Sequence, residues 1–311
     1  MSVFSTPAFL ETVAELYHPG RAAAVEVCRI DGLALRMLVL DGHEVVTSAP
    51  FYDYPQPLEA PGTGQARPLR YVPRTVLRTT TVEQRPELLP GQHPSPYVDW
   101  SRFADHATFE AMVGQRIGNL LPDSRRRQRK LERDLGPLRF IFDDARDETF
   151  ETCVRWKSAQ YRETGLPDMF AQPRNVELFR RLRDRGVVVL SSLSAGDRLV
   201  AAHLGGMAEG RHAWWVPAYD PELAGYSPGR LMLHEILRES HARGHREFDF
   251  LIGDEAYKFH YATHSRLIGP LGTPPLRDRV LTSLRSKTRS ALEGHPALLN
   301  AARSMKRHLF S

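Results

Sequence analysis

The chain has 311 residues, of which 41% are hydrophobic and 25% are charged, a composition typical of a globular protein that needs no disulfide or metal staple to fold. Its net charge is +5, but residues 271–311 contain eight Lys and Arg against two Asp and Glu. The rest of the chain is almost neutral, so the basic character belongs to a tail. This distribution disfavours a protein that binds DNA over its whole surface.

The two cysteines, Cys28 and Cys153, lie far apart and have no metal-ligand spacing, which is typical of reduced thiols in the cytoplasm. The first 16 residues have no basic start and no long apolar run, so we expect no secretory signal. No stretch reaches the roughly 18 apolar residues that a membrane span requires.

The first third of the chain predicts an irregular, β-rich lobe without a catalytic motif. Residues 4–17 have the pattern of a short helix, and residues 24–30 and 33–40 that of two strands joined by a hairpin turn at Asp31-Gly32. A third strand is predicted over 45–54 and a fourth over 74–82. Prolines and glycines predict loops over 55–73 and 84–96.

The rest of the chain predicts regular elements in alternation. Helices are expected at 103–121, 123–135, 147–164, 173–185, 228–243 and 255–261. Strands are expected at 138–142, 187–194, 199–207, 212–219, 247–251 and 265–269. The tail, from about residue 276, has the pattern of amphipathic helices with a cationic face. That face either packs in solvent against the body or attaches to an anionic membrane surface or partner.

Three segments of the second lobe carry a resemblance to a known family. They are Ala218-Tyr-Asp-Pro, Tyr226-Ser-Pro-Gly-Arg-Leu and Phe248-Asp-Phe-Leu-Ile-Gly-Asp-Glu-Ala-Tyr-Lys. Together with the element order, they resemble the GCN5-related N-acetyltransferases (GNAT), in particular the acetyltransferases associated with bacterial cellulose and exopolysaccharide biosynthesis. The basic run at 126–135 also resembles that family's basic helix. The similarity covers roughly residues 100–270.

The resemblance implies an α+β GNAT fold, with a mostly antiparallel mixed sheet, and three regions. Residues 1–100 would form a degenerate GNAT-like lobe, 101–270 the acyltransferase domain and 271–311 a basic helical tail. A tandem of this kind is shared with the Fem-type aminoacyltransferases of cell-wall assembly.

In GNAT enzymes the central strand separates from its neighbour, and the pantetheine arm of acyl-CoA pairs with the freed backbone. The pyrophosphate then lies at the N-terminus of the next helix. The resemblance assigns these donor contacts to the strand and the loop that follow residue 213, with Ser227 expected as the helix cap. The residues implied are Trp215, Val216, Ala218, Tyr219, Gly225, Ser227, Gly229 and Arg230.

The loop departs from the usual pattern Gln/Arg-x-x-Gly-x-Gly/Ala, because Ala224 and Ser227 stand where Gln/Arg and the first Gly belong. The donor is therefore open between acyl-CoA and aminoacyl-tRNA. The loop also reads G-x-S-x-G, the motif of serine hydrolases. A hydrolase needs a backbone N–H after the serine, and Pro228 has none, so this alternative is disfavoured.

Acyl transfer to an amine needs a base for the amine and an acid for the leaving thiolate. We expect Glu255 to be the base, Tyr257 or Tyr261 the acid, and Asp249 either a catalytic or a buried, paired acid. Lys258 would bind phosphate or pair with Glu255. No cofactor is expected, since acyl-CoA acts as a co-substrate.

Other polar residues have a structural and a functional interpretation. Six bases lie within 125–133, Arg126 among them, and they either face solvent or contact the phosphate of CoA, a nucleotide-linked acceptor or tRNA. One of Trp214 and Trp215 should pack in the core and the other, Trp214 in our assignment, should line the substrate pocket. His203 is expected in the core. His260 and His264 have ligand spacing, but Tyr261 replaces the metalloprotease Glu, so no metal site is expected.

The sequence therefore predicts a cytoplasmic acyl-CoA-dependent N-acyltransferase whose acceptor bears an amine or, less favoured, a hydroxyl. Two alternatives stay open. One is an aminoacyl-tRNA-dependent transferase on the same fold. The other is a non-catalytic scaffold of a polysaccharide or lipid assembly complex that uses the basic tail for peripheral membrane contact.

Overall fold

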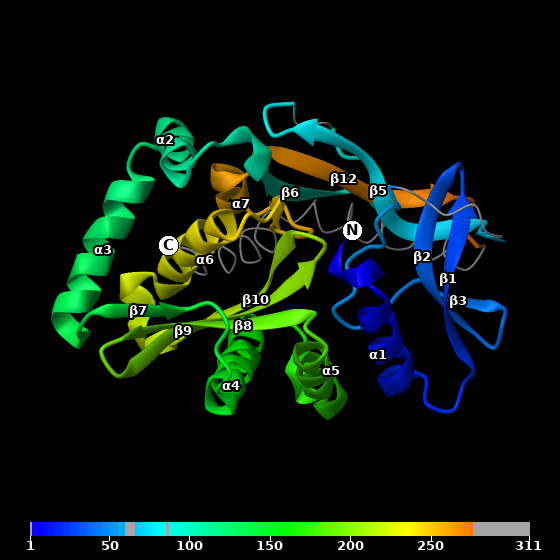
Figure 1. The fold of residues 1–311 in the computed structure, drawn as a ribbon, viewed down its shortest axis with the longest axis horizontal. Helices are drawn as coiled ribbons and strands as arrows, with labels where there is room; N and C mark the ends of the chain where they lie inside the picture. Colours follow the sequence, from blue (N-terminus) through cyan, green and yellow to red (C-terminus); the bar gives the residue numbers. More distant parts are fainter. Residues whose placement is uncertain (1, 60–65, 85–86, 276–311) are drawn as a thin grey trace, which may run out of the picture.

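The computed structural model describes residues 2–59, 66–84 and 87–275. These residues form a four-stranded sheet near the N-terminus and an eight-stranded sheet flanked by helices, the mixed α+β architecture that the sequence predicts (Figure 1). The predicted basic tail begins at 271, and nearly all of it lies outside the described residues. Among the described residues, no helix is long and apolar enough to cross a membrane.

The N-terminal lobe begins with η1 (Val3–Ser5) and α1 (Pro7–Tyr17). Its sheet has the strand order β3 (Glu44–Val46), β2 (Leu33–Leu40), β1 (Ala23–Ile30) and β4 (Arg67–Pro68). The hairpin between β1 and β2 is confirmed, and both turn residues, Asp31 and Gly32, have the positive φ that a tight two-residue turn requires. The strand predicted over 45–54 is wrong beyond Val46, because the chain leaves the sheet there and turns at Phe51, which also has a positive φ.

The large sheet draws its strands from both ends of the chain. Its order is β5 (Tyr71–Thr81), β12 (His264–Gly272), β6 (His93–Asp99), β11 (Glu247–Asp249), β10 (Arg211–Tyr219), β9 (Arg198–Ala208), β8 (Val188–Ala195) and β7 (Leu138–Ile141). Neighbours run antiparallel except for β10 and β11, which are parallel. Two strands that precede residue 100 thus complete a sheet whose other strands follow residue 137.

Strand β6 lies inside a segment predicted as a loop, and that prediction is wrong from His93 onward. Prolines are rare inside sheets because they donate no ladder hydrogen bond. Here the Pro94 and Pro96 carbonyls still accept bonds, from Gly253 N (3.0 Å) and Phe250 N (2.9 Å). The strand is therefore held through its acceptors at the proline positions.

Helices cover both faces of the large sheet. On one face, α4 (Asp147–Glu163) and α5 (Pro173–Asp184) pack with α1 in one hydrophobic core. On the other face, α2 (His106–Arg116), α3 (Leu120–Leu135), α6 (Pro228–Ala242) and α7 (Ala256–Tyr261) contribute to a second core. Figure 1 shows α4 and α5 on one side of β8 and β9 and α6 on the other.

The two helices predicted over 103–121 and 123–135 are present, but the break between them comes earlier in the chain. Helix α2 ends at Arg116 with Ile117 as its C-cap, and α3 begins at Leu120. The second helix is stopped by Gly136, as predicted, and Gly136 contacts a second glycine, Gly196, in the β8–β9 turn. A Cβ on Gly196 would lie 2.3 Å from the Leu135 carbonyl oxygen, so only glycine fits where these turns cross.

Candidate active site

The two parallel strands at the centre of the large sheet separate. Pairing between β10 and β11 ends at Ala213 and Asp249, whereas β10 continues to Tyr219. The β10–β9 register also shifts between Ala213 and Val216, and within this bulge Trp215 N donates to Nε2 of His203 (3.2 Å). The sheet thus has a gap along one side of β10.

A cavity of about 500 Å³ occupies this gap. Helix α4 lines it with Lys157 and Gln160 from one face of the sheet, while α6 and α7 line it from the opposite face. The cavity therefore crosses the sheet, and we call it the channel. Its lining residues are Leu120, Arg127, Lys157, Gln160, Trp214, Pro217, Tyr219, Ala224, Gly225, Ser227, Pro228, Gly229, Arg230, Leu233, Tyr257, His260 and Tyr261.

One mouth of the channel lies at the start of α6. Ser227 precedes the helix in the left-handed region (φ 53°, ψ 53°), so its side chain forms no cap, contrary to the expectation from the sequence. Its buried hydroxyl has no hydrogen-bond partner among the described residues. The helix start and this unsatisfied hydroxyl leave polar groups at a place where the helix dipole favours an anion.

Two arginines are fixed at this mouth by a single carboxylate. Asp123 of α3 accepts hydrogen bonds from Arg127 Nε (2.8 Å) and from Arg230. Arg127 also donates to the Gly225 carbonyl (2.8 Å), which fastens α3 to the loop before α6. The pKa of Asp123 is held well below its usual value by hydrogen bonds from Arg126, Arg127 and Arg230. The two guanidinium groups are thus oriented before any ligand arrives.

The middle of the channel is aromatic and carries two phenols. The Tyr257 hydroxyl accepts a hydrogen bond from Trp214 Nε1 (3.2 Å), and burial raises its pKa well above the usual value. The Tyr261 hydroxyl lies 2.7 Å from His234 Nε2, and burial raises its pKa too. Both phenols therefore stay protonated.

The other mouth carries a lysine. Lys157 Nζ donates to Gln160 Oε1 (2.8 Å) and lies 5.3 Å from the centre of the Tyr161 ring. Burial lowers the pKa of Lys157 to about 8. Among the described residues, no carboxylate lies within 4.0 Å of this ammonium group.

Comparison with protein families matches residues 121–259 to the acetyltransferase (GNAT) domain. This match spans 139 of the 311 residues. The separated parallel strands, and the helix that begins at the channel mouth, both lie within these residues. The chain therefore carries an acyltransferase domain.

Solved structures extend the likeness of the fold beyond the GNAT domain. FemX is 11% identical with a TM-score of 0.51, over 86% of this chain and 93% of that chain. L-PGS from Bacillus licheniformis is 11% identical with a TM-score of 0.45, over 93% and 98%. A conserved protein of unknown function from Bacteroides thetaiotaomicron VPI-5482 is 9% identical with a TM-score of 0.40, and this chain spans 62% of its length. Comparison with curated proteins finds no match. The two-lobed fold is thus similar to that of FemX.

Several of the residues that the sequence singled out line the channel of the GNAT domain, among them Trp214, Tyr219, Gly225, Ser227, Gly229, Arg230, Tyr257 and Tyr261. A Cβ on Gly229 would lie 3.3 Å from the Tyr219 ring. Trp214 and Trp215 do point to opposite faces of β10, and Trp215 packs against Phe4 and Phe9 in the core.

The other predicted residues lie outside the channel lining. Val216 and Ala218 are buried in the core on the α4 face. Arg126 is exposed on α3 and pairs with Asp123 (2.6 Å). Glu255 precedes α7 and pairs with Lys258 (3.1 Å), whose ammonium group also donates to the Ile252 carbonyl (3.0 Å). Glu255 is near enough to affect the pKa values of Lys157 and Tyr257 through its charge.

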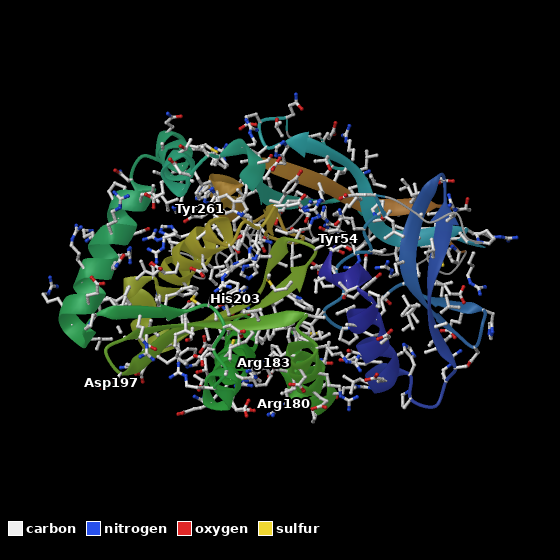
Figure 2. The ribbon with its side chains drawn as sticks, viewed as in Figure 1. Tyr54, Arg180, Arg183, Asp197, His203 and Tyr261 are labelled. Atoms are coloured by element: carbon white, nitrogen blue, oxygen red, sulfur yellow. The ribbon has the colours of Figure 1, made fainter. Side chains whose placement is uncertain are left out.

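Asp249 lies in a buried hydrogen-bond network outside the channel lining. Its carboxylate accepts from Tyr54 (3.1 Å), Ser95 (3.4 Å), Leu251 N (2.8 Å) and Arg266 (3.3 Å), and the Asp249 and Arg266 side chains are each 4% exposed. Figure 2 shows Tyr54 near the N-terminal lobe, away from Tyr261 on α7. The carboxylate therefore joins the N-terminal segment to three strands of the large sheet.

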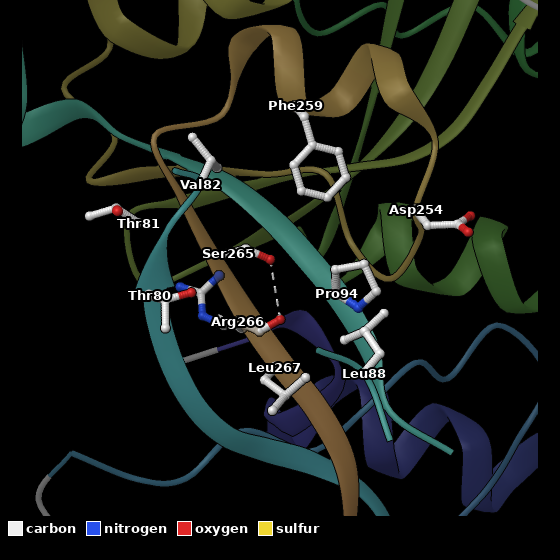
Figure 3. Close-up of a pocket in the computed structure, with 10 residues that line it drawn as sticks. All are labelled: Thr80, Thr81, Val82, Leu88, Pro94, Asp254, Phe259, Ser265, Arg266 and Leu267. Atoms are coloured by element: carbon white, nitrogen blue, oxygen red, sulfur yellow. Dashed lines mark hydrogen bonds between the residues drawn. The ribbon is translucent and has the colours of Figure 1, made fainter. Parts of the chain in front are cut away.

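A second cavity of about 130 Å³ lies over β5, β6 and β12, beside this network (Figure 3). It is lined by Thr80, Thr81, Val82, Leu88, Pro94, Asp254, Phe259, Ser265, Arg266 and Leu267. The Arg266 charge is already compensated by Glu247 and Asp249. This cavity thus offers no free cation to a ligand.

Histidines form a buried cluster behind the channel. His203 stacks on Trp214, with 4.4 Å between ring centres, and lies 5.6 Å from His212 (Figure 2). Both imidazoles are fully buried, and burial lowers the pKa of His212 to about 3. His203 is a core residue, as expected. Among the described residues, no group of three His, Cys, Asp or Glu could hold a metal ion.

Sequence reasoning missed Lys157 and Gln160 as channel residues, whereas Arg127 is one of the six bases for which it offered a phosphate contact. A signal for Lys157 was present. Phe150, Val154 and Tyr161 form the apolar stripe of α4, and Lys157 lies on the same stripe, between Val154 and Tyr161 at helical spacing. A lone lysine on an apolar stripe is unusual, because lysine is almost never buried without a functional or paired role.

Proposed function

We propose that the chain is an acyl-CoA-dependent N-acyltransferase, which moves an acyl group from a thioester to an amine, or less favourably to a hydroxyl, of a small-molecule, glycan-precursor or lipid-precursor acceptor. The observation that supports this most is the channel, which crosses the GNAT domain where β10 and β11 separate. A donor that enters from the α6 face and an acceptor that enters from the α4 face would meet inside it.

The α6 mouth suits the diphosphate of coenzyme A. Its helix N-terminus, Arg127 and Arg230 attract negative charge, and Gly229 lets a ligand approach the backbone. The free side of β10 beyond Ala213 would pair with the amide groups of the pantetheine arm, as an added strand does. Aromatic side chains of Trp214 and Tyr219 would enclose the arm.

In the proposed reaction, the acceptor amine attacks the thioester carbonyl directly, without a covalent enzyme intermediate. Glu255 would take the proton of the amine, because an ammonium has no lone pair with which to attack. The Tyr257 phenol, which stays protonated, would donate a hydrogen bond to the oxygen or sulfur that gains negative charge.

Isothermal titration calorimetry with acetyl-CoA and longer acyl-CoAs tests the donor. We expect micromolar binding that weakens about tenfold or more in Arg230→Ala, which removes a charged phosphate contact. The matched control is Arg238→Ala, which truncates another α6 arginine whose side chain is 60% exposed and lies outside the channel lining. No binding of any thioester to the wild-type protein would rule out the coenzyme A version.

An aminoacyl-tRNA-dependent transferase is the second candidate. It is favoured by the departure of the loop from the usual acyl-CoA pattern at Ala224 and Ser227, and by the basic face of α3. Arg125, Arg126 and Arg133 expose 61%, 70% and 70% of their side chains there, which suits a phosphate backbone. This candidate predicts activity that needs charged tRNA and is lost after ribonuclease treatment.

A non-catalytic scaffold in the cytoplasm, attached to an anionic membrane surface through residues 271–311, is the remaining candidate. It rests on the charge of the tail, eight bases against two acids. It predicts that Glu255→Gln and Tyr257→Phe have no effect in cells, while removal of 271–311 abolishes function. The enzyme hypothesis predicts that both point variants lose function with the tail intact.

A further inference from the structure

We infer that Lys157 is the proton donor to the departing sulfur, so that the acid of the reaction comes from α4, on the acceptor face of the sheet. This inference rests on the proposed function and assigns a role that neither the GNAT match nor the sequence motifs supply.

The two sides of the channel carry different groups. Its α6 mouth carries Arg230 and the helix N-terminus, which suit phosphate. A donor anchored there places its thioester at the far end, where Lys157 and Gln160 of α4 line the cavity. The Lys157 ammonium group is therefore the cation nearest to the reacting end among the channel-lining residues of α4.

Lys157 is not committed to an ion pair. Its hydrogen bond goes to Gln160, a neutral amide, and among the described residues no acid lies within salt-bridge distance. In Lys258, by contrast, the ammonium group is bound by Glu255 and the Ile252 carbonyl. A partly buried cation without a counter-charge is costly, which favours the arrival of negative charge in the channel.

The groups around Lys157 suit proton transfer. Cys153 and Tyr161 flank it on α4, His203 faces it from β9, and Glu255 interacts with it through its charge from the α7 side. With these neighbours its pKa is about 8, close to the value of about 8.5 for the thiol of cysteine. A proton therefore passes between the two groups with little change in free energy.

The step balances as follows. The amine nitrogen forms a bond to the carbonyl carbon, the C–S bond breaks, and its electron pair goes to sulfur. Sulfur takes a proton from the Lys157 ammonium group, and the amine loses one to Glu255. Transfer of that proton from Glu255 to Lys157 restores both residues, so the net change is one proton from nitrogen to sulfur.

The product complex tests this without knowledge of the acceptor. Calorimetry compares coenzyme A with desulfo-coenzyme A, which lacks the thiol, from about pH 6 to about pH 10. If Lys157 faces the sulfur, wild-type protein prefers coenzyme A by about tenfold near pH 8, where a thiolate and an ammonium group coexist. The preference declines on both sides of that pH.

Lys157→Met should abolish the preference while acetyl-CoA affinity stays within about threefold, and Lys157→Arg should keep it. The control is Lys130→Met, which removes a cation that lies over the Tyr226 ring, outside the channel lining. Equal affinity of the wild-type protein for the two ligands at every pH would overturn the inference, even if Lys157→Met did not fold. If neither ligand binds, the proposed function fails as well, so the two failures are distinguishable.

Discussion

Asp249→Asn is expected to lower the stability of the protein rather than its affinity for the donor. The change keeps the shape of the side chain and removes its charge. Four hydrogen bonds converge on this carboxylate, and its partner Arg266 is equally buried. An amide cannot accept at both positions, so one NH₂ group would face a donor.

The magnitude follows from the burial of the pair. Loss of one partner of a buried ion pair costs about 3–5 kcal/mol, because the other charge stays buried. Arg266 keeps Glu247 as a second partner, so the lower end, about 3 kcal/mol, is expected here. For a chain of this size that free energy corresponds to a fall in Tm of about 5 °C.

Urea unfolding followed by tryptophan fluorescence measures the difference. The matched control is Glu151→Gln, the same kind of change in a pair with Arg180 whose side chains are 47% and 45% exposed, and it should cost less than about 1 kcal/mol. Equal costs for the two variants would refute the argument from burial. A stable Asp249→Asn protein that no longer binds acetyl-CoA would move Asp249 into the catalytic site.

Three further predictions concern the turns, the histidines and the phenol. Gly196→Ala should lower the free energy of unfolding by at least about 2 kcal/mol more than Gly186→Ala does. Both residues have positive φ, but only a Cβ on Gly196 would meet a backbone atom. Equal losses in the two variants would contradict the clash. His212 takes up a proton in the unfolded state below about pH 6.5 but in the native state only near pH 3, so stability falls as pH drops between these values, by about 1.4 kcal/mol per unit. His212→Gln should flatten this dependence in thermal unfolding, and an unchanged slope would exclude His212 as its source. Tyr257→Phe should lower the acyl-transfer rate about 100-fold with acetyl-CoA affinity retained, whereas full activity would assign the phenol a packing role.

The sequence predicted the regular elements well where the turn and helix-stop residues agree with the hydrophobic periodicity. Gly136 and Gly186 marked the ends of helices, and Asp31-Gly32 marked a hairpin. It failed at β6, because Pro94 and Pro96 indicate a loop unless another segment supplies donors to their carbonyls, as the residues after β11 do here. Those donors come from residues about 150 positions later, which no local pattern contains.

The candidate site was predictable only along the chain segment that carries the motifs. Ser227, Gly229 and Arg230 follow one another, so their proximity is local. The assignment of Asp249 was left open because alternation fixes the face of a strand but not the partner, which is Arg266 on another strand. Lys157 reaches the channel only because β10 and β11 separate, a property of the sheet rather than of α4.

The position of β6 between β11 and β12 has a consequence for how the protein is made. Residues 93–99 leave the ribosome long before residues 247–272, so β6 must wait unpaired while the intervening 150 or so residues are synthesised. Contacts of such high sequence separation slow folding, because loop closure precedes any gain from pairing. A fragment that starts at residue 101 lacks β5 and β6, so it would expose one edge of β11 and both edges of β12. Such open edges favour aggregation, so the channel is best studied in the full chain.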